Sequence, residues 1–293
     1  SQENVAVAVG FEAGKSQQGA NATAVGRQAG ETSQGAQAIA IGMYAGMKSQ
    51  GDYAIAMGYV AGSNQQGDNT VAIGREAGQT SQGGDATAVG RQAGNSEQGV
   101  KSTAVGYYAG NVSQGNQAVA VGREAGQTEQ GSNSTAVGWR AGQVSQGDNA
   151  VATGLLAGYS EQGDNTVAVG NQAGKTSQGN QAVAVGYYTG LSEQGANSTA
   201  IGREAGQTSQ GDNATAVGYQ AGNSEQANTA VAVGNQAGHT SQGLHAVALG
   251  VKAGLTEQGS QAVAVGTSAG MTSQGEVAVA IGWQAGNSEQ GQH

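Results

Sequence analysis

The chain contains no cysteine and no proline, and only one of its 293 residues is phenylalanine. The absence of cysteine excludes a disulfide framework and a thiolate metal site. The absence of proline suits a continuous ladder of strands, because proline has no backbone N–H to donate. Aromatic residues make up 4% of the sequence, too few to fill a conventional globular core of this length, so we expect a thin core.

Positive charge and long apolar runs are also scarce. Only 11 lysines and arginines are present, scattered along a chain of formal net charge −9. A nucleic-acid partner is not expected, because a phosphate-binding surface needs clustered cations. The longest apolar run, at residues 5–9, is far shorter than the roughly 20 residues of a membrane-spanning helix, so membrane insertion is not expected either. The first residues do not resemble a signal peptide, and we interpret the chain as a mature or excised segment.

Glycine, in contrast, is abundant and strictly periodic. A glycine closes an Ala-Val-Ala-Val-type segment every 16 residues, from Gly10 to Gly282, in 18 copies without insertion or deletion. A second glycine follows four positions later in every copy, and a third follows nine positions later in all but one, where Ala227 stands. A short period held in phase predicts a solenoid in which one repeat forms one coil. Residues 1–293 are therefore predicted to form one continuous repeat array.

The residues before each closing glycine alternate in type. Counting back from the glycine, the first is Val or Ile in all but three copies, the second is always Ala, and the third is always Val, Ile or Thr. Alternation with period two and a β-branched row predicts a strand. The predicted fold class is therefore all-β, a parallel β-solenoid (β-roll) of 18 coils of 16 residues. At about 4.8 Å per coil this would be a rod of roughly 80 to 90 Å.

The alternation leaves open which row points into the coil. If the β-branched row points inward, alanines form the outer surface; if the alanines point inward, a strip of Val, Ile and Thr lies outside. Either arrangement exposes a long apolar surface, which soluble monomers rarely do, so we predict self-association as a trimer or filament. Because invariant Ala favours close approach of two backbones, the candidate self-association row is Ala8, Ala24, Ala40, Ala136, Ala168, Ala200 and Ala280.

An invariant glutamine stands eight positions after each closing glycine, for example Gln34. We assign this segment to a second, shorter strand, and we predict that glutamines of successive coils bond amide to amide. The residue before it alternates strictly between Ser and Glu from Ser81 to Glu289. Carboxylates on every coil would repel by roughly 1 kcal/mol per pair, and alternation halves this cost. Duplication of a 32-residue unit explains the same pattern, and both interpretations stand.

Catalytic and metal-binding patterns are missing. His239, His245 and His293 have no ligand spacing, and the aspartates occur singly in turns rather than densely, as a calcium-binding roll requires. The neighbouring Arg–Glu pairs, such as Arg75 and Glu76, are expected to point in different directions on an extended backbone. No Ser/His/Asp arrangement is present in the sequence, so we expect no enzyme, no cofactor and no metal.

The two positions after each closing glycine vary freely and carry most of the aromatic residues. The candidate surface-contact residues there are Tyr107, Tyr108, Trp139, Tyr187, Tyr188 and Trp283. Such side chains can pack across a subunit boundary, which we favour, or can grip a partner or glycan.

The strand motif at residues 6–10, 22–26, 38–42 and each later equivalent resembles the head repeats of YadA-like trimeric autotransporter adhesins, and also repeats of phage and large-virus fibres. The resemblance implies a left-handed parallel β-roll, three of which pack into a trimeric head. Each coil is two residues longer than is usual in that family, in segments such as residues 30–35.

These observations predict an extracellular structural fibre or adhesin segment on a cell or virion surface. Its partners would be itself, as a homotrimer or filament, and a host surface protein or glycan. A filament subunit without an adhesive role is one alternative. An ice- or crystal-binding solenoid is another, which is less favoured because only six of 18 coils carry Thr in the β-branched row.

Overall fold

The computed structural model describes residues 5–289 and residue 291, and these contain 35 three-residue strands and no helix. They divide into two compact units, Ser1–Asn149 and Ala150–His293. A single array over residues 1–293 stays a prediction, and each unit is described by itself.

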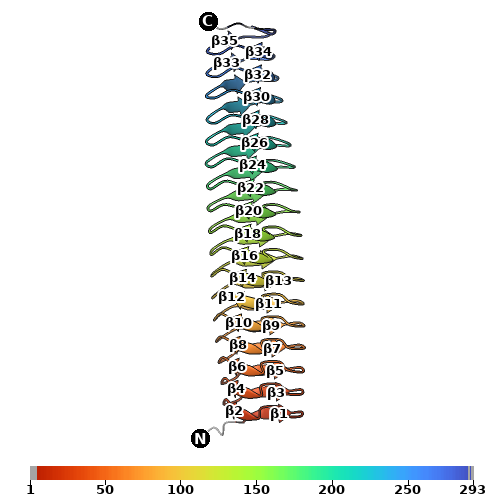
Figure 1. Ribbon diagram of the computed structural model, residues 1–293. Coiled ribbons are helices and arrows are strands. Elements are labelled where there is room, and N and C mark those ends of the chain that lie inside the picture. The colour runs from red at the N-terminus through yellow and green to blue at the C-terminus, as the bar shows by residue number, and fades with distance from the viewer. Residues whose placement is uncertain (1–4, 290, 292–293) are drawn as a thin grey trace. The chain divides into compact units, whose positions relative to one another are not determined.

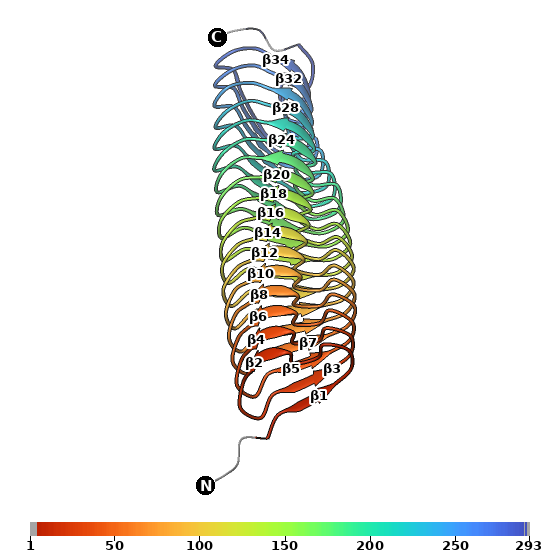
Figure 2. The ribbon, with the colours of Figure 1, turned by 60° about the horizontal axis from the view of Figure 1, so that its bottom comes forward.

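Each 16-residue repeat contributes two strands, one on each side of a narrow coil (Figures 1 and 2). In the first unit, the strands that precede the closing glycines are β1 (Val7–Val9), β3 (Thr23–Val25), β5 (Ile39–Ile41), β7 (Ile55–Met57), β9 (Val71–Ile73), β11 (Thr87–Val89), β13 (Thr103–Val105), β15 (Val119–Val121) and β17 (Thr135–Val137). The strands that end at the glutamines are β2 (Ser16–Gln18), β4 (Thr32–Gln34), β6 (Lys48–Gln50), β8 (Asn64–Gln66), β10 (Thr80–Gln82), β12 (Ser96–Gln98), β14 (Val112–Gln114), β16 (Thr128–Gln130) and β18 (Val144–Gln146).

The second unit repeats this arrangement. Its first set of strands is β19 (Val151–Thr153), β21 (Val167–Val169), β23 (Val183–Val185), β25 (Thr199–Ile201), β27 (Thr215–Val217), β29 (Val231–Val233), β31 (Val247–Leu249), β33 (Val263–Val265) and β35 (Val279–Ile281). Its second set is β20 (Ser160–Gln162), β22 (Thr176–Gln178), β24 (Ser192–Gln194), β26 (Thr208–Gln210), β28 (Ser224–Gln226), β30 (Thr240–Gln242), β32 (Thr256–Gln258) and β34 (Thr272–Gln274).

Within each unit, every strand pairs in parallel with the equivalent strand of the next coil. The register is one repeat, so that Val183 lies beside Thr199 and Ala184 beside Ala200. The predicted parallel β-solenoid with a 16-residue coil is therefore confirmed.

The core of each unit consists almost entirely of alanine methyl groups. The middle residue of the first strand is fully buried in nearly every coil, and it packs against the alanine that follows three positions after the closing glycine. The coil is narrow at this level: a Cβ atom added to Gly222 would lie 3.1 Å from the Cβ atom of Ala216. Only small side chains fit between the two strand faces, which confirms the thin core.

The candidate self-association row is wrong for this reason. Five of its members have no exposed surface, and Ala280 is 2% exposed, so these side chains cannot reach another molecule; the five are Ala24, Ala40, Ala136, Ala168 and Ala200. Ala8 is exposed because it lies in the first coil that the structure describes. The alternative arrangement, with Val, Ile and Thr outside, is the one observed.

The predicted glutamine ladder is present. Gln226 is 1% exposed, and its Nε2 donates to the carbonyl oxygens of Thr215 at 2.8 Å and Ala230 at 3.1 Å. The same nitrogen lies 3.1 Å from Oε1 of Gln242 in the next coil, and Gln210 donates to Oε1 of Gln226 at 3.1 Å. The ladder therefore joins both strands of one coil and also joins successive coils.

Two glycine rows are fixed by space as well as by backbone conformation. Gly222 has φ +51°, and a Cβ atom there would lie 2.6 Å from Oε1 of Gln226. The closing glycine Gly218 has φ +132°, and a Cβ atom there would lie 2.5 Å from the carbonyl oxygen of Gly234 in the next coil. A side chain at either position would collide with the ladder or with the stack.

Candidate functional site

The outward-facing first and third residues of the odd-numbered strands form an apolar surface in each unit, which we call the outer strip. These residues are Val, Ile or Thr, with Met57 and Leu249 as exceptions. They are half-buried by their neighbours in adjacent coils or exposed, with Ile41 37% and Leu249 45% exposed. No member of the strip carries a charge. The strip can therefore contact another apolar surface over many coils.

The alternating Ser and Glu residues form a separate hydrogen-bonded ladder. Ser113 Oγ donates to Glu97 Oε2 at 2.9 Å, and Ser209 Oγ donates to Glu193 Oε2 at 2.9 Å. Each serine thus binds the carboxylate of the preceding coil. This pairing gives the alternation a physical role in addition to spacing the charges.

All six arginines occupy the two positions that follow a closing glycine; they are Arg27, Arg75, Arg91, Arg123, Arg140 and Arg203. Because successive coils stack in register, these residues line up along one corner of the coil within each unit, which we call the arginine corner. The sequence description of the cations as scattered is wrong for the arginines, because residues 16 positions apart are neighbours in a solenoid of this period.

Aromatic rings alternate with these arginines and lie against their guanidinium groups. The Cζ atom of Arg203 lies 5.7 Å from the centre of the Tyr187 ring and 5.6 Å from that of Tyr219. The Tyr107 ring lies in the same way between Arg91 at 5.5 Å and Arg123 at 5.6 Å. These cation–π contacts hold both partners in place at the corner.

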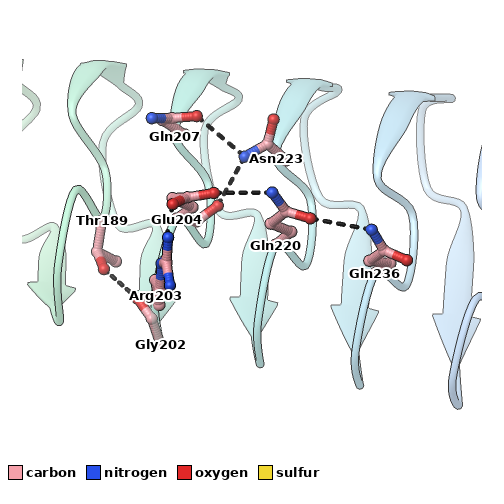
Figure 3. A network of polar contacts seen from close by, with 8 residues as sticks. All are labelled: Thr189, Gly202, Arg203, Glu204, Gln207, Gln220, Asn223 and Gln236. Carbon is pink, nitrogen blue, oxygen red and sulfur yellow. Dashed lines mark hydrogen bonds and ion pairs between the residues drawn. The ribbon is translucent and has the colours of Figure 1, made fainter.

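The neighbouring Arg–Glu residues also form ion pairs, contrary to the sequence expectation. Arg203 Nε donates to Glu204 Oε1 at 2.9 Å (Figure 3), and Arg123 Nε lies 3.0 Å from Glu124 Oε1. The expectation assumed an extended backbone, whereas Glu204 has φ +57°. The left-handed turn brings the second side chain to the same side as the first.

The carboxylate of Glu204 is the centre of a small polar network (Figure 3). Gln220 Nε2 donates to its Oε2 at 2.7 Å, Gln236 donates to Gln220 at 2.9 Å, and Asn223 donates to the backbone oxygen of Glu204 at 2.9 Å. The hydrogen bond from Gln220, followed by that from Arg203, lowers the pKa of Glu204 below its usual range. The same ion pair raises the pKa of Arg203.

A related network in the first unit buries its carboxylate more deeply. Burial alone would raise the pKa of Glu124, but hydrogen bonds from Arg140 and Arg123 lower it below the usual value. Arg140 Nε lies 2.6 Å from Glu124 Oε2, and its Cζ lies 4.9 Å from the ring centre of Trp139. Both units therefore hold an arginine against a ring and a carboxylate.

The candidate surface aromatics all lie at this corner. Tyr107 and Tyr108 pack edge to face with ring centres 4.4 Å apart, and Tyr187 and Tyr188 do so at 4.3 Å. Trp139 is 41% exposed and Trp283 is 76% exposed. The rings pack within the chain, while a contact across a subunit boundary stays a prediction.

The turn residues have structural roles. Asp212 Oδ1 accepts the backbone N–H of Ala196 in the preceding coil at 2.8 Å, and Asn180 accepts that of Asp164 at 3.0 Å. His239 lies 2.8 Å from Thr240 Oγ1, and burial lowers its pKa, while His293 lies outside the described residues. In residues 5–289 and 291, no three His, Cys, Asp or Glu side chains gather as a metal site would require.

Neither a pocket nor a membrane helix is found in the part of the chain that the structure describes. No enclosed pocket is present there, so a ligand would have to bind an open surface. No helix there is long and apolar enough to cross a membrane.

The fold and its surfaces define a repeat protein, a parallel β-solenoid whose repeated surfaces lie outside the coil. The family model for the YadA head domain repeat matches residues 49–77, 162–189 and 208–222, about a quarter of the chain. The chain therefore carries YadA-like head repeats, as the strand motif predicted. No curated protein matches the sequence.

Proposed function

We propose that this chain is the self-associating, surface-displayed segment of an adhesin, in which copies of the chain pack through the outer strip and leave the arginine corner for attachment. YadA-like head repeats make an adhesin-type β-solenoid. Self-association, attachment and an extracellular location extend that description. The outer strip is the observation that carries the proposal.

The size of the outer strip supports a partner. Each unit stacks nine strands of the first set. At about 4.8 Å per strand and a width of about 10 Å, the strip covers on the order of 400 Å² in each unit. This approaches the largest apolar patch that a typical soluble monomer exposes. Covering it would remove a comparable area from water at about 25 cal/mol per Å².

A second copy of the chain is the occupant that fits best. The strip presents apolar residues at a fixed interval along the stack, and only a partner with the same interval can match it coil for coil. Another copy has that interval by construction. The resemblance to YadA-like heads implies that three such rolls pack together, and an adhesive role on a cell or virion surface follows from the same resemblance.

The test compares two triple arginine variants in the same three coils by light scattering. The strip variant is Val233→Arg, Leu249→Arg and Val265→Arg. The control variant is Asn235→Arg, Val251→Arg and Thr267→Arg, at the corner position where arginine occurs naturally in other coils. We expect a multimer for the natural chain and the control, and a monomer with unchanged strand content for the strip variant, since three buried charges would oppose packing.

Two results would contradict the proposal. The first is a monodisperse monomer for the natural chain, and a monomer that also halted ice growth would favour the lattice-binding alternative. The second is equal loss of mass in both triple variants, which would place the contact elsewhere.

A further inference from the structure

We infer that the arginine corner of the first unit is a binding site for a linear polysaccharide that carries carboxylate or sulfate groups. The inference rests on the proposed attachment function and names the chemistry of its ligand. Its core consists of Arg75, Arg91 and Arg123, with the rings of Tyr59 and Tyr107 between and beside them.

Charge is separated in this chain. The two corner positions hold seven cations, the six arginines and Lys252, and four carboxylates, although the whole chain has a formal net charge of −9. The remaining acidic residues lie mostly at the Ser–Glu ladder and in the turns. The corner is therefore the part of the coil at which an anion meets an excess of positive charge.

The arginines are held in a fixed geometry before any ligand binds. Arg75 Cζ lies 5.7 Å from the Tyr59 ring centre, and Arg75 Nε donates to Glu76 Oε1 at 2.9 Å. Glu76 in turn accepts a hydrogen bond from Gln92. Immobilised donors lose little conformational entropy when they bind, which raises the affinity per contact.

Much of each guanidinium group stays available to a ligand. The side chains of Arg75 and Arg123 are 56% and 61% exposed. Their Nε atoms bind the adjacent carboxylates, while their terminal nitrogens donate to no other side chain among the described residues. Two free N–H groups on one planar guanidinium match the oxygens of a carboxylate or sulfate.

The spacing of the corner suits a sugar polymer. Parallel strands lie about 4.8 Å apart, so arginines two coils apart, such as Arg91 and Arg123, are separated by roughly 10 Å. This is the length of one disaccharide in an extended chain. An acidic polysaccharide with one or two anionic groups per disaccharide could therefore meet successive arginines along the first unit.

A single-stranded nucleic acid fits less well. Such ligands bind by stacking bases on free aromatic faces. Both sides of the Tyr107 ring are already occupied by Arg91 and Arg123, so it offers no free face to a base. A polymer with a charge on every nucleotide would also be repelled more strongly by a chain of net charge −9.

The experiment measures binding of heparin, hyaluronan, uncharged dextran and poly(dT) to the whole chain at several salt concentrations. The corner variant is Arg75→Asn, Arg91→Asn and Arg123→Asn; asparagine occurs naturally at this position in Asn171 and Asn235. The control removes three cations elsewhere in the same unit, as Lys15→Asn, Lys48→Asn and Lys101→Asn. Circular dichroism establishes that both variants are folded.

We expect the natural chain to bind at least one of the two acidic polysaccharides and not dextran. The corner variant should bind at least about tenfold more weakly, with a salt slope reduced by about 3, while the lysine control should stay within about twofold. Absence of binding to both acidic polysaccharides, an equal loss in the lysine control, or tighter binding of poly(dT) would overturn the inference. Light scattering on the same variants reports self-association separately, so failure of the outer strip and failure of the corner are distinguishable.

Discussion

Replacing one ladder glutamine by glutamate tests the core of the coil without changing its shape. In Gln226→Glu, the nitrogen that faces the carbonyl oxygens of Thr215 and Ala230 and Oε1 of Gln242 becomes an oxygen. At neutral pH a carboxylate would stand against three acceptors with no donor between them. The amide hydrogen bonds are lost, and a buried charge is left without a partner.

The expected magnitude follows from these contacts. Two lost hydrogen bonds cost about 1 kcal/mol each, and the unsatisfied oxygens cost about 1–3 kcal/mol more, which gives about 4 kcal/mol above neutral pH. A cost of about 4 kcal/mol corresponds to about three pK units, so the pKa of the new carboxyl group should rise from about 4.3 in the unfolded chain to about 7 in the folded one. A raised pKa means that the variant is nearest to the natural chain below about pH 4 and loses stability as the pH rises to about 7.

The assay is denaturant unfolding followed by far-ultraviolet circular dichroism at pH 4 and pH 8, with each variant compared with the natural chain at the same pH. The control is Gln261→Glu, which adds the same charge at an exposed turn and should change the free energy of unfolding by less than about 0.5 kcal/mol. The reasoning is refuted if Gln226→Glu is as stable as the natural chain at pH 8, or if its deficit is larger at pH 4 than at pH 8.

Four further predictions concern other parts of the coil. Ala168→Arg should abolish strand content in circular dichroism, because the site is fully buried among methyl groups; lost assembly with strands retained would return this row to a subunit contact. Gly218→Ala should destabilise by about 3 kcal/mol or more in denaturant unfolding, whereas Gly84→Ala, whose Cβ atom would meet only one atom at 3.7 Å, should be tolerated; equal effects would contradict the stacking geometry. Val60→Asn should raise stability by about 1 kcal/mol, because a β-branched residue there has φ +58°, and a lower unfolding midpoint would disprove this. Since the pKa of Glu204 is lowered, its ion pair and hydrogen bonds should stabilise above about pH 4 and be lost in acid, and Glu204→Gln should weaken this acid sensitivity; an unchanged pH profile would refute the role of this carboxylate.

The sequence predicts the coil, the strands and the glutamine ladder because each depends only on identity at a fixed interval. Residues such as Gln210 and Gln226 are one repeat apart, and stacking in register brings them into contact. It leaves the direction of the strand side chains open because both rows are apolar. The width of the coil decides this, since Ala216 has room only for a methyl group beside Gly222. An invariant small row next to a row that accepts Val, Ile, Met and Leu is typical of a tight interior and a permissive exterior.

The arginine corner could be predicted only by counting residues modulo the repeat. Arg91 and Tyr107 are far apart in composition statistics but lie in adjacent coils. The pairing of Arg203 with Glu204 could not be predicted from a strand pattern, because it depends on a left-handed backbone at a non-glycine residue. The lowered pKa of Glu204 follows from that same turn.

A cysteine cross-link tests most directly whether one repeat is one coil. The chain has no native cysteine, and Thr240 and Thr256 are paired neighbours in adjacent coils on the side of the glutamine strands. Their Cα atoms should lie about 4.8 Å apart, within the usual range for a disulfide, whereas Thr240 and Thr272 should lie roughly 10 Å apart. Mild oxidation and mass spectrometry of dilute protein should show an intramolecular disulfide in Thr240→Cys/Thr256→Cys and none in Thr240→Cys/Thr272→Cys. Failure of the first pair, or equal cross-linking of the second, would contradict the parallel solenoid with a coil of 16 residues.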